Sequence, residues 1–218
     1  MHCQDPFYTK YLSGYGTPVV SSAKVSDQAL RLACRITGSM VSARADVRQA
    51  LANNRFHVAV LATTEVTTDI PEYADLYAAF PATDWNLQRG IGATTVRPAC
   101  SCAEENLLCR SDDRFASSDI LVPMVAHGLR DLGIRDVDAQ FDGAIRSAYA
   151  TAMARGLWGG TPATSDVSFY WAVGAQAWFD VSNEVPVHGQ AAVLQYDPAL
   201  AALLASYLPG DDWHPGCH

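Results

Sequence analysis

Histidines are the residues of this chain best suited to acid–base chemistry near neutral pH. The chain has six of them, and His127 ends the apolar stretch 123–127, where an imidazole can act as a general acid or base. A histidine in such a stretch can equally be a core residue that hydrogen-bonds a backbone group, so both interpretations stay open. His188 follows a segment that is expected to be helical. We expect it to lie in a loop or to face the same site as His127.

Other common catalytic signatures are absent from the sequence. No Gly-x-Ser-x-Gly segment supports a serine hydrolase, and no glycine pair is followed by the Gly-Lys-Ser/Thr of a phosphate-binding loop. Cys100-Ser-Cys102 lacks the two-residue gap of a zinc ribbon. These classes are therefore not predicted.

Composition excludes two classes of partner. The 218 residues carry a net charge of -8 with no basic stripe, which disfavours nucleic acid. No apolar run approaches the ~20 residues needed to span a bilayer. The hydrophobic fraction of 49% is typical of a globular chain.

The cysteines suggest a compartment. Six cysteines, with one near each end of the chain, suit a disulfide-bonded protein that is secreted or resides in the lumen of the secretory pathway. The bonds we expect are Cys102–Cys109 and Cys3–Cys217, while buried free thiols remain the alternative. The polar start of the chain is interpreted as a mature N-terminus preceded by an added Met.

Hydrophobic spacing and capping residues predict a mixed first part and a helical second part. The segment before residue 20 is expected to be an ordered arm, and residues 66–116 to form loops with short strands. A strand is predicted over 57–65. Helices are predicted over 26–41, 44–53, 119–132, 138–155, 166–180 and 197–208, with Gly133 ending the third. This order indicates an α+β fold, with one domain over 1–218 that divides into an α/β lobe (1–116) and a helical lobe (117–218).

Several stretches of the chain resemble small zincin-like metallopeptidases, related in their catalytic lobe to the anthrax lethal factor type. They run in order through nearly the whole chain, and no single one is specific. The stretches are 5–8, 16–20, 67–72, 104–109, 156–158, 170–172, 178–180 and 196–198. The resemblance implies a zincin-like fold.

That family carries an HExxH segment on the helix corresponding to 119–132. Two His at i and i+4 bind one Zn²⁺, the Glu beside the first activates water, and a Glu on a later helix is the third ligand. Here the segment has Pro123 and Met124 in place of the first His and the Glu, and it keeps His127. The later helix has Val173 at the position of the third ligand. The resemblance thus implies a degenerate member with no metal, no cofactor and no zinc-peptidase activity. Pro123 further requires that the helix be kinked or start late.

All three replacements are apolar, so the metal pocket is expected to have become an apolar cleft. His127, Tyr149 and Tyr170 are the candidate catalytic residues. The candidate cleft residues are Pro123, Met124, Trp171, Val173, Trp178 and His188. The alternative, in which these side chains only fill the space left by zinc, stays open.

Two functions from different classes follow. The first is binding of a small hydrophobic molecule, with a metal-independent cyclisation, isomerisation or rearrangement as a further step that orientation in a dry pocket can promote. The second is a secreted, non-catalytic pseudo-peptidase that binds a peptide or protein by strand addition. The sequence leaves the identity of the ligand, the presence of any reaction and the oligomeric state undetermined.

Overall fold

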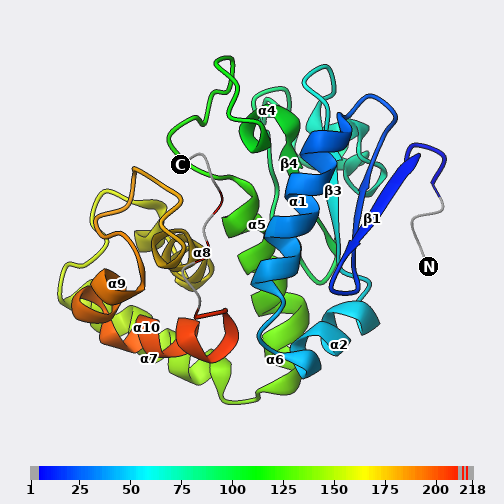
Figure 1. Ribbon diagram of the computed structural model, residues 1–218. Coiled ribbons are helices and arrows are strands. Elements are labelled where there is room, and N and C mark those ends of the chain that lie inside the picture. The colour runs from blue at the N-terminus through cyan, green and yellow to red at the C-terminus, as the bar shows by residue number, and fades with distance from the viewer. Residues whose placement is uncertain (1–4, 211–212, 214, 216–218) are drawn as a thin grey trace.

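The computed structural model describes residues 5–210, 213 and 215 of the chain. A four-stranded sheet packs beside a helical half (Figure 1). Its strands, in spatial order, are β1 (Lys10–Gly14), β2 (Thr17–Ser21), β3 (His57–Leu61) and β4 (Ala99–Ala103). The first two strands are antiparallel, and the other pairs are parallel. The predicted α+β class is confirmed.

Helices make up most of the rest of the described chain. The longer ones are α1 (Asp27–Met40), α2 (Ala45–Asn53), α5 (Leu121–Gly128), α7 (Phe141–Ala154), α8 (Val167–Trp178), α9 (Gln190–Tyr196) and α10 (Pro198–Tyr207). The shorter ones are η1 (Thr67–Asp69), η2 (Pro71–Tyr73), α3 (Leu76–Ala79), α4 (Glu104–Leu107), η3 (Leu129–Ile134), α6 (Arg135–Val137) and η4 (Pro162–Thr164).

Side-chain caps begin three of these helices where the sequence predicted them. Ser26 accepts a hydrogen bond from the Ala29 amide at the start of α1. Asp166 caps α8, and Asp197 caps α10. Each cap satisfies amides that have no partner inside the helix. The short helix α9 was not predicted.

The sheet is covered on both faces, which explains the unbroken apolar run of β3. Val58 and Val60 belong to the larger hydrophobic cluster, together with residues of α1 and α5. Ala59 and Leu61 belong to a smaller cluster with Tyr73 on the opposite face. The predicted strand was too long, since it ends at Leu61. The expected N-terminal arm is instead largely the β1–β2 hairpin, closed by Tyr15 and Gly16 with positive φ.

Gly133 does not end the helix that begins at Leu121. The chain continues from α5 through η3, a π-helical segment, into α6, so the predicted stop at Leu132 is wrong. A Cβ on Gly133 would lie 2.8 Å from a methyl group of Val47. The glycine therefore serves close packing against α2. The next helix begins later than predicted, at Phe141, with Asp138 accepting from the Gln140 amide before it.

One hydrophobic cluster includes β-strand residues and residues of every long helix, so the two parts of the chain share a core.

The predicted Cys102–Cys109 disulfide is wrong. Cys102 is a buried free thiol, as is Cys100, whereas Cys109 is disulfide-bonded. The predicted Cys3–Cys217 bond lies outside the described residues. No helix in the described ranges is long and apolar enough to cross a membrane.

Candidate functional site

A cavity of about 220 Å³ lies where α5 and α8 face each other, open to solvent on one side. Pro123 and Met124 from α5 and Val173 from α8 all line it. Ile120, Val185 and the half-exposed Phe115 add further apolar surface. Three positions that the sequence resemblance assigned to the metal site therefore meet at one cavity, and all three are apolar.

The start of α5 explains how Pro123 is accommodated. The helix begins at Leu121, so Pro123 is its third residue, in the first turn, where an amide has no partner within the helix. The Asp119 side chain accepts from the Val122 amide at 2.8 Å, and the Asn106 side chain accepts from the Ile120 amide at 2.8 Å. Of the two predicted outcomes, a kink or a late start, the structure has the late start.

Two glycines bring a loop against α5 beside the cavity. A Cβ on Gly92 would lie 2.7 Å from Cδ2 of His127, and one on Gly90 would overlap Ile120. Between them, Ile91 accepts from the Ser101 amide at 2.9 Å, and its own amide donates to the Ser101 hydroxyl at 3.1 Å. This loop therefore covers the outer edge of β4 at Ser101.

A two-segment wall closes another side of the cavity. The Asp119 amide donates to the Val181 carbonyl, and the Asn183 amide donates to the Ser117 carbonyl, each at 2.8 Å. Between these bonds the hydroxyls of Ser118 and Ser182 lie 2.6 Å apart. Both serines line the cavity, as do Gln176 and Glu184. Sequence analysis missed these polar residues, because they come together through long-range backbone pairing, which no local sequence motif indicates.

His127 lies one turn beyond Met124 but does not line the cavity. Its Nδ1 is 2.8 Å from the Ser168 hydroxyl, and its ring packs edge-on against Phe169. Burial lowers the pKa of His127 below its ordinary value, which favours a neutral imidazole at pH 7. The partner is a side chain and not the backbone group expected for a core histidine.

The remaining predicted residues do not line the cavity. The Tyr170 hydroxyl donates to Asp197 at 2.6 Å, and the Tyr149 hydroxyl donates to the Thr164 carbonyl at 2.9 Å. Trp171 and Trp178 are buried, with their indole N–H groups donating to backbone carbonyls. His188 is exposed and pairs with Asp180. Only Pro123, Met124 and Val173 of the nine predicted site residues line the cavity.

These residues do not fit a catalytic zinc ion. Proline, methionine and valine offer no nitrogen, carboxylate or thiolate ligand, and catalytic zinc sites use about three such protein ligands. Within residues 5–210, 213 and 215, no group of three His, Cys, Asp or Glu side chains is placed to hold a metal. The motif positions therefore supply one imidazole at most.

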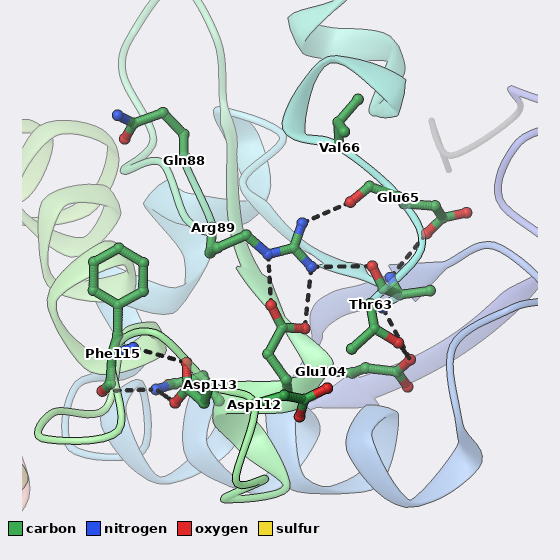
Figure 2. A network of polar contacts seen from close by, with 12 residues as sticks. Thr63, Glu65, Val66, Gln88, Arg89, Glu104, Asp112, Asp113 and Phe115 are labelled. Atoms are coloured by element: carbon green, nitrogen blue, oxygen red, sulfur yellow. Dashed lines mark hydrogen bonds and ion pairs between the residues drawn. The ribbon is translucent and has the colours of Figure 1, made fainter. Parts of the chain in front are cut away.

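A buried polar network borders the cavity at Arg89 (Figure 2). The Arg89 guanidinium forms a bidentate pair with Glu105, at 2.6 and 3.0 Å, and donates to the carbonyls of Glu65 and Ala62. The Glu104 carboxylate accepts from the amides of Ser26 and Thr63. This network joins the loop after β3 and the loop that leads into β4 to the start of α1.

No family model and no curated protein matches the sequence. Among solved structures, the chain is similar to the PRO-PRO endopeptidase PPEP-2 from Paenibacillus alvei, with a TM-score of 0.56 and 12% identity. The match covers 86% of this chain and 95% of that chain. At this identity the likeness concerns the fold alone, and the chain has a zincin-like α+β fold.

Proposed function

We propose that this protein binds a small apolar molecule in the cavity between α5 and α8, without a zinc ion at the motif positions. One observation carries the proposal: Pro123, Met124 and Val173, which stand at the metal-site positions implied by the sequence resemblance, line a single cavity.

The size of the cavity limits the ligand. An apolar cavity of about 150 Å³ is enough to bind benzene. The present one, at about 220 Å³, suits one ring with a short substituent. Met124 adds an adaptable and polarizable wall for such a ring. Ligand sites in general combine an apolar lining with a few polar groups that set orientation, and Ser118, Ser182 and Glu184 are the candidates for that part here.

Binding is better supported than a reaction. A general acid or base must come within hydrogen-bond reach of the bound molecule. None of the candidate catalytic residues His127, Tyr149 and Tyr170 lines the cavity, and each is engaged by another group. These three residues are therefore given no catalytic role in this proposal.

The alternative, peptide binding by strand addition at β4, has weaker support. Strand addition needs free backbone groups along a sheet edge. The Ser101 amide of β4 already donates to Ile91 of the same chain, so a peptide would have to displace the loop held there by Gly90 and Gly92.

A titration with toluene, followed by amide chemical shifts, tests the proposal. We expect saturable shifts centred on Met124 and Val173, which are lost in Val173→Phe because the larger side chain fills the cavity. Val96→Phe, at a position that is 79% exposed, is the matched control and should bind as the wild type does. Met124→Phe provides a second filled cavity if Val173→Phe fails to fold, as judged by circular dichroism. Unchanged toluene binding in a folded filled variant, or no saturable shift in the wild type, overturns the proposal.

A further inference from the structure

Charged side chains around the cavity are unevenly distributed. Its lining includes one guanidinium, Arg89, and two carboxylates, Asp119 and Glu184. The lining contains no lysine and no histidine. The charge presented to a ligand therefore depends on whether Arg89 is neutralised.

Arg89 is neutralised by Glu105. The pair is bidentate, and both side chains are more than nine-tenths buried. The guanidinium also donates hydrogen bonds to the backbone carbonyls of Glu65 and Ala62 (Figure 2). With Arg89 and Glu105 cancelling, the exposed residue Glu184 gives the cavity lining a negative charge.

Glu184 is the carboxylate best placed to meet a ligand. Glu184 is an exposed residue of the cavity lining, and one of its carboxylate oxygens accepts a hydrogen bond from the Ser117 hydroxyl. Its own amide donates to the Ser182 hydroxyl at 3.2 Å, which fixes the backbone beneath it. No Lys, Arg or His within the described ranges forms an ion pair with Glu184. Asp119, in contrast, is buried and caps α5.

We infer that the ligand is a small apolar amine, with its ring against Pro123, Met124 and Val173 and its ammonium group at Glu184. This inference rests on the proposed function and names the chemical class of its ligand. A cation gains from the Glu184 carboxylate, whereas a carboxylate of the same size and shape is repelled. A neutral alcohol can use the hydroxyls of Ser118 and Ser182 but gains no ionic attraction.

Three probes of similar shape test the inference: 2-phenylethylamine, 2-phenylethanol and phenylacetate, titrated at pH 7 and low salt by calorimetry. The amine should bind on the order of fivefold more tightly than the alcohol, the upper range for an exposed ion pair, and phenylacetate should bind most weakly. The preference for the amine should shrink as salt is added, because salt screens exposed charges.

Glu184→Gln should remove the preference for the amine and leave binding of the alcohol unchanged. Asp27→Asn, which removes one exposed carboxylate on α1 that is absent from the cavity lining, controls for net charge and should keep the preference. Equal binding of amine and alcohol to the wild type overturns the inference and leaves the proposed function standing. Failure of all three probes, or binding that survives in a folded Val173→Phe variant, overturns both. A preference reduced equally by Asp27→Asn and Glu184→Gln also overturns the inference, because it would reflect the charge of the whole molecule.

Discussion

The polar network around Arg89 and the apolar cavity between α5 and α8 are neighbours, and they differ in what occupies the space between their side chains. In the network, Arg89, Glu105 and Glu104 each pair with a side chain or backbone group inside the protein. The cavity instead is lined largely by apolar side chains, and polar lining residues such as Ser118, Ser182 and Glu184 have hydrogen-bond partners around it. A buried polar group stabilises a fold only when its partners are present, so the network fits a structural role, while the cavity has space that a ligand can fill.

Within the network, Glu65 is the residue at which the hydrogen bonding ends. One of its oxygens accepts from the Ala62 amide at 2.9 Å. The other oxygen has no hydrogen-bond partner and lies 3.7 Å from the Lys24 ammonium group. The network therefore ends at a lysine that is largely exposed, at the surface.

The largest expected effect comes from breaking the Arg89–Glu105 pair. Arg89→Met leaves the Glu105 charge buried and unpaired, which should lower the free energy of unfolding by about 3–5 kcal/mol. Urea denaturation measures this. The double variant Arg89→Met with Glu105→Met should recover most of the loss, since no charge is then left alone. If the double variant is as unstable as Arg89→Met, the loss of stability does not come from the unpaired charge of Glu105.

Asn106 connects the network to the start of α5. Its amide nitrogen donates to Asp113 and to the carbonyls of Phe115 and Ser118, and its oxygen accepts from the Ile120 amide. Asn106→Ala should cost about 1–3 kcal/mol of stability, because buried groups lose their partners. Asn53→Ala, at an exposed position, is the matched control and should change stability by less than about 0.5 kcal/mol in the same urea titration. Equal losses in the two variants would argue against the connecting role.

His127 predicts a pH dependence of stability. Its folded-state pKa is lowered by burial, so near and below its ordinary pKa the unfolded chain binds more protons than the folded chain. Stability then falls as pH drops from 7 through the ordinary pKa of a histidine toward the folded-state value. His127→Gln should flatten this decline in denaturation midpoints between pH 7 and 5. His188→Gln, which removes an exposed imidazole, should leave the decline in place, and a flattening in both variants would contradict the assignment.

The smallest effect is expected inside the cavity. Val173→Leu adds one carbon where space exists, so the free energy of unfolding should change by less than about 1 kcal/mol. Val60→Leu adds the same carbon in the fully buried sheet and should cost about 1–3 kcal/mol through overpacking. Thermal unfolding of both variants checks the contrast. A larger loss at Val173 than at Val60 would mean that the cavity is not available space.

Much of the fold could be predicted because its signals are local. The caps Ser26, Asp166 and Asp197 mark helix starts within one or two residues of the observed bounds. The helix end predicted at Gly133 was wrong because a glycine can either end a helix or permit close packing. Only the position of Val47 in the fold decides between the two.

The site was only partly predictable for a related reason. Pro123, Met124 and Val173 could be found because the resemblance to zincin-like metallopeptidases implies metal-site positions there. The aromatic residues near them in sequence, Trp171 and Tyr170, could not be separated from the core by type or spacing, and both are core. Glu184 and Ser182 carried no local signal, since a contact with residues 117–118 places them.

The most direct test of the account is the zinc stoichiometry of the purified wild-type chain, measured by elemental analysis after equilibration with Zn²⁺ and removal of free metal. The account predicts no stoichiometric zinc in the wild type, and one zinc per chain in the variant carrying Pro123→His, Met124→Glu and Val173→Glu, which completes around His127 the ligand pattern that the sequence resemblance implies. One zinc bound per wild-type chain would contradict the claim that the metal-site positions have become an apolar ligand cavity.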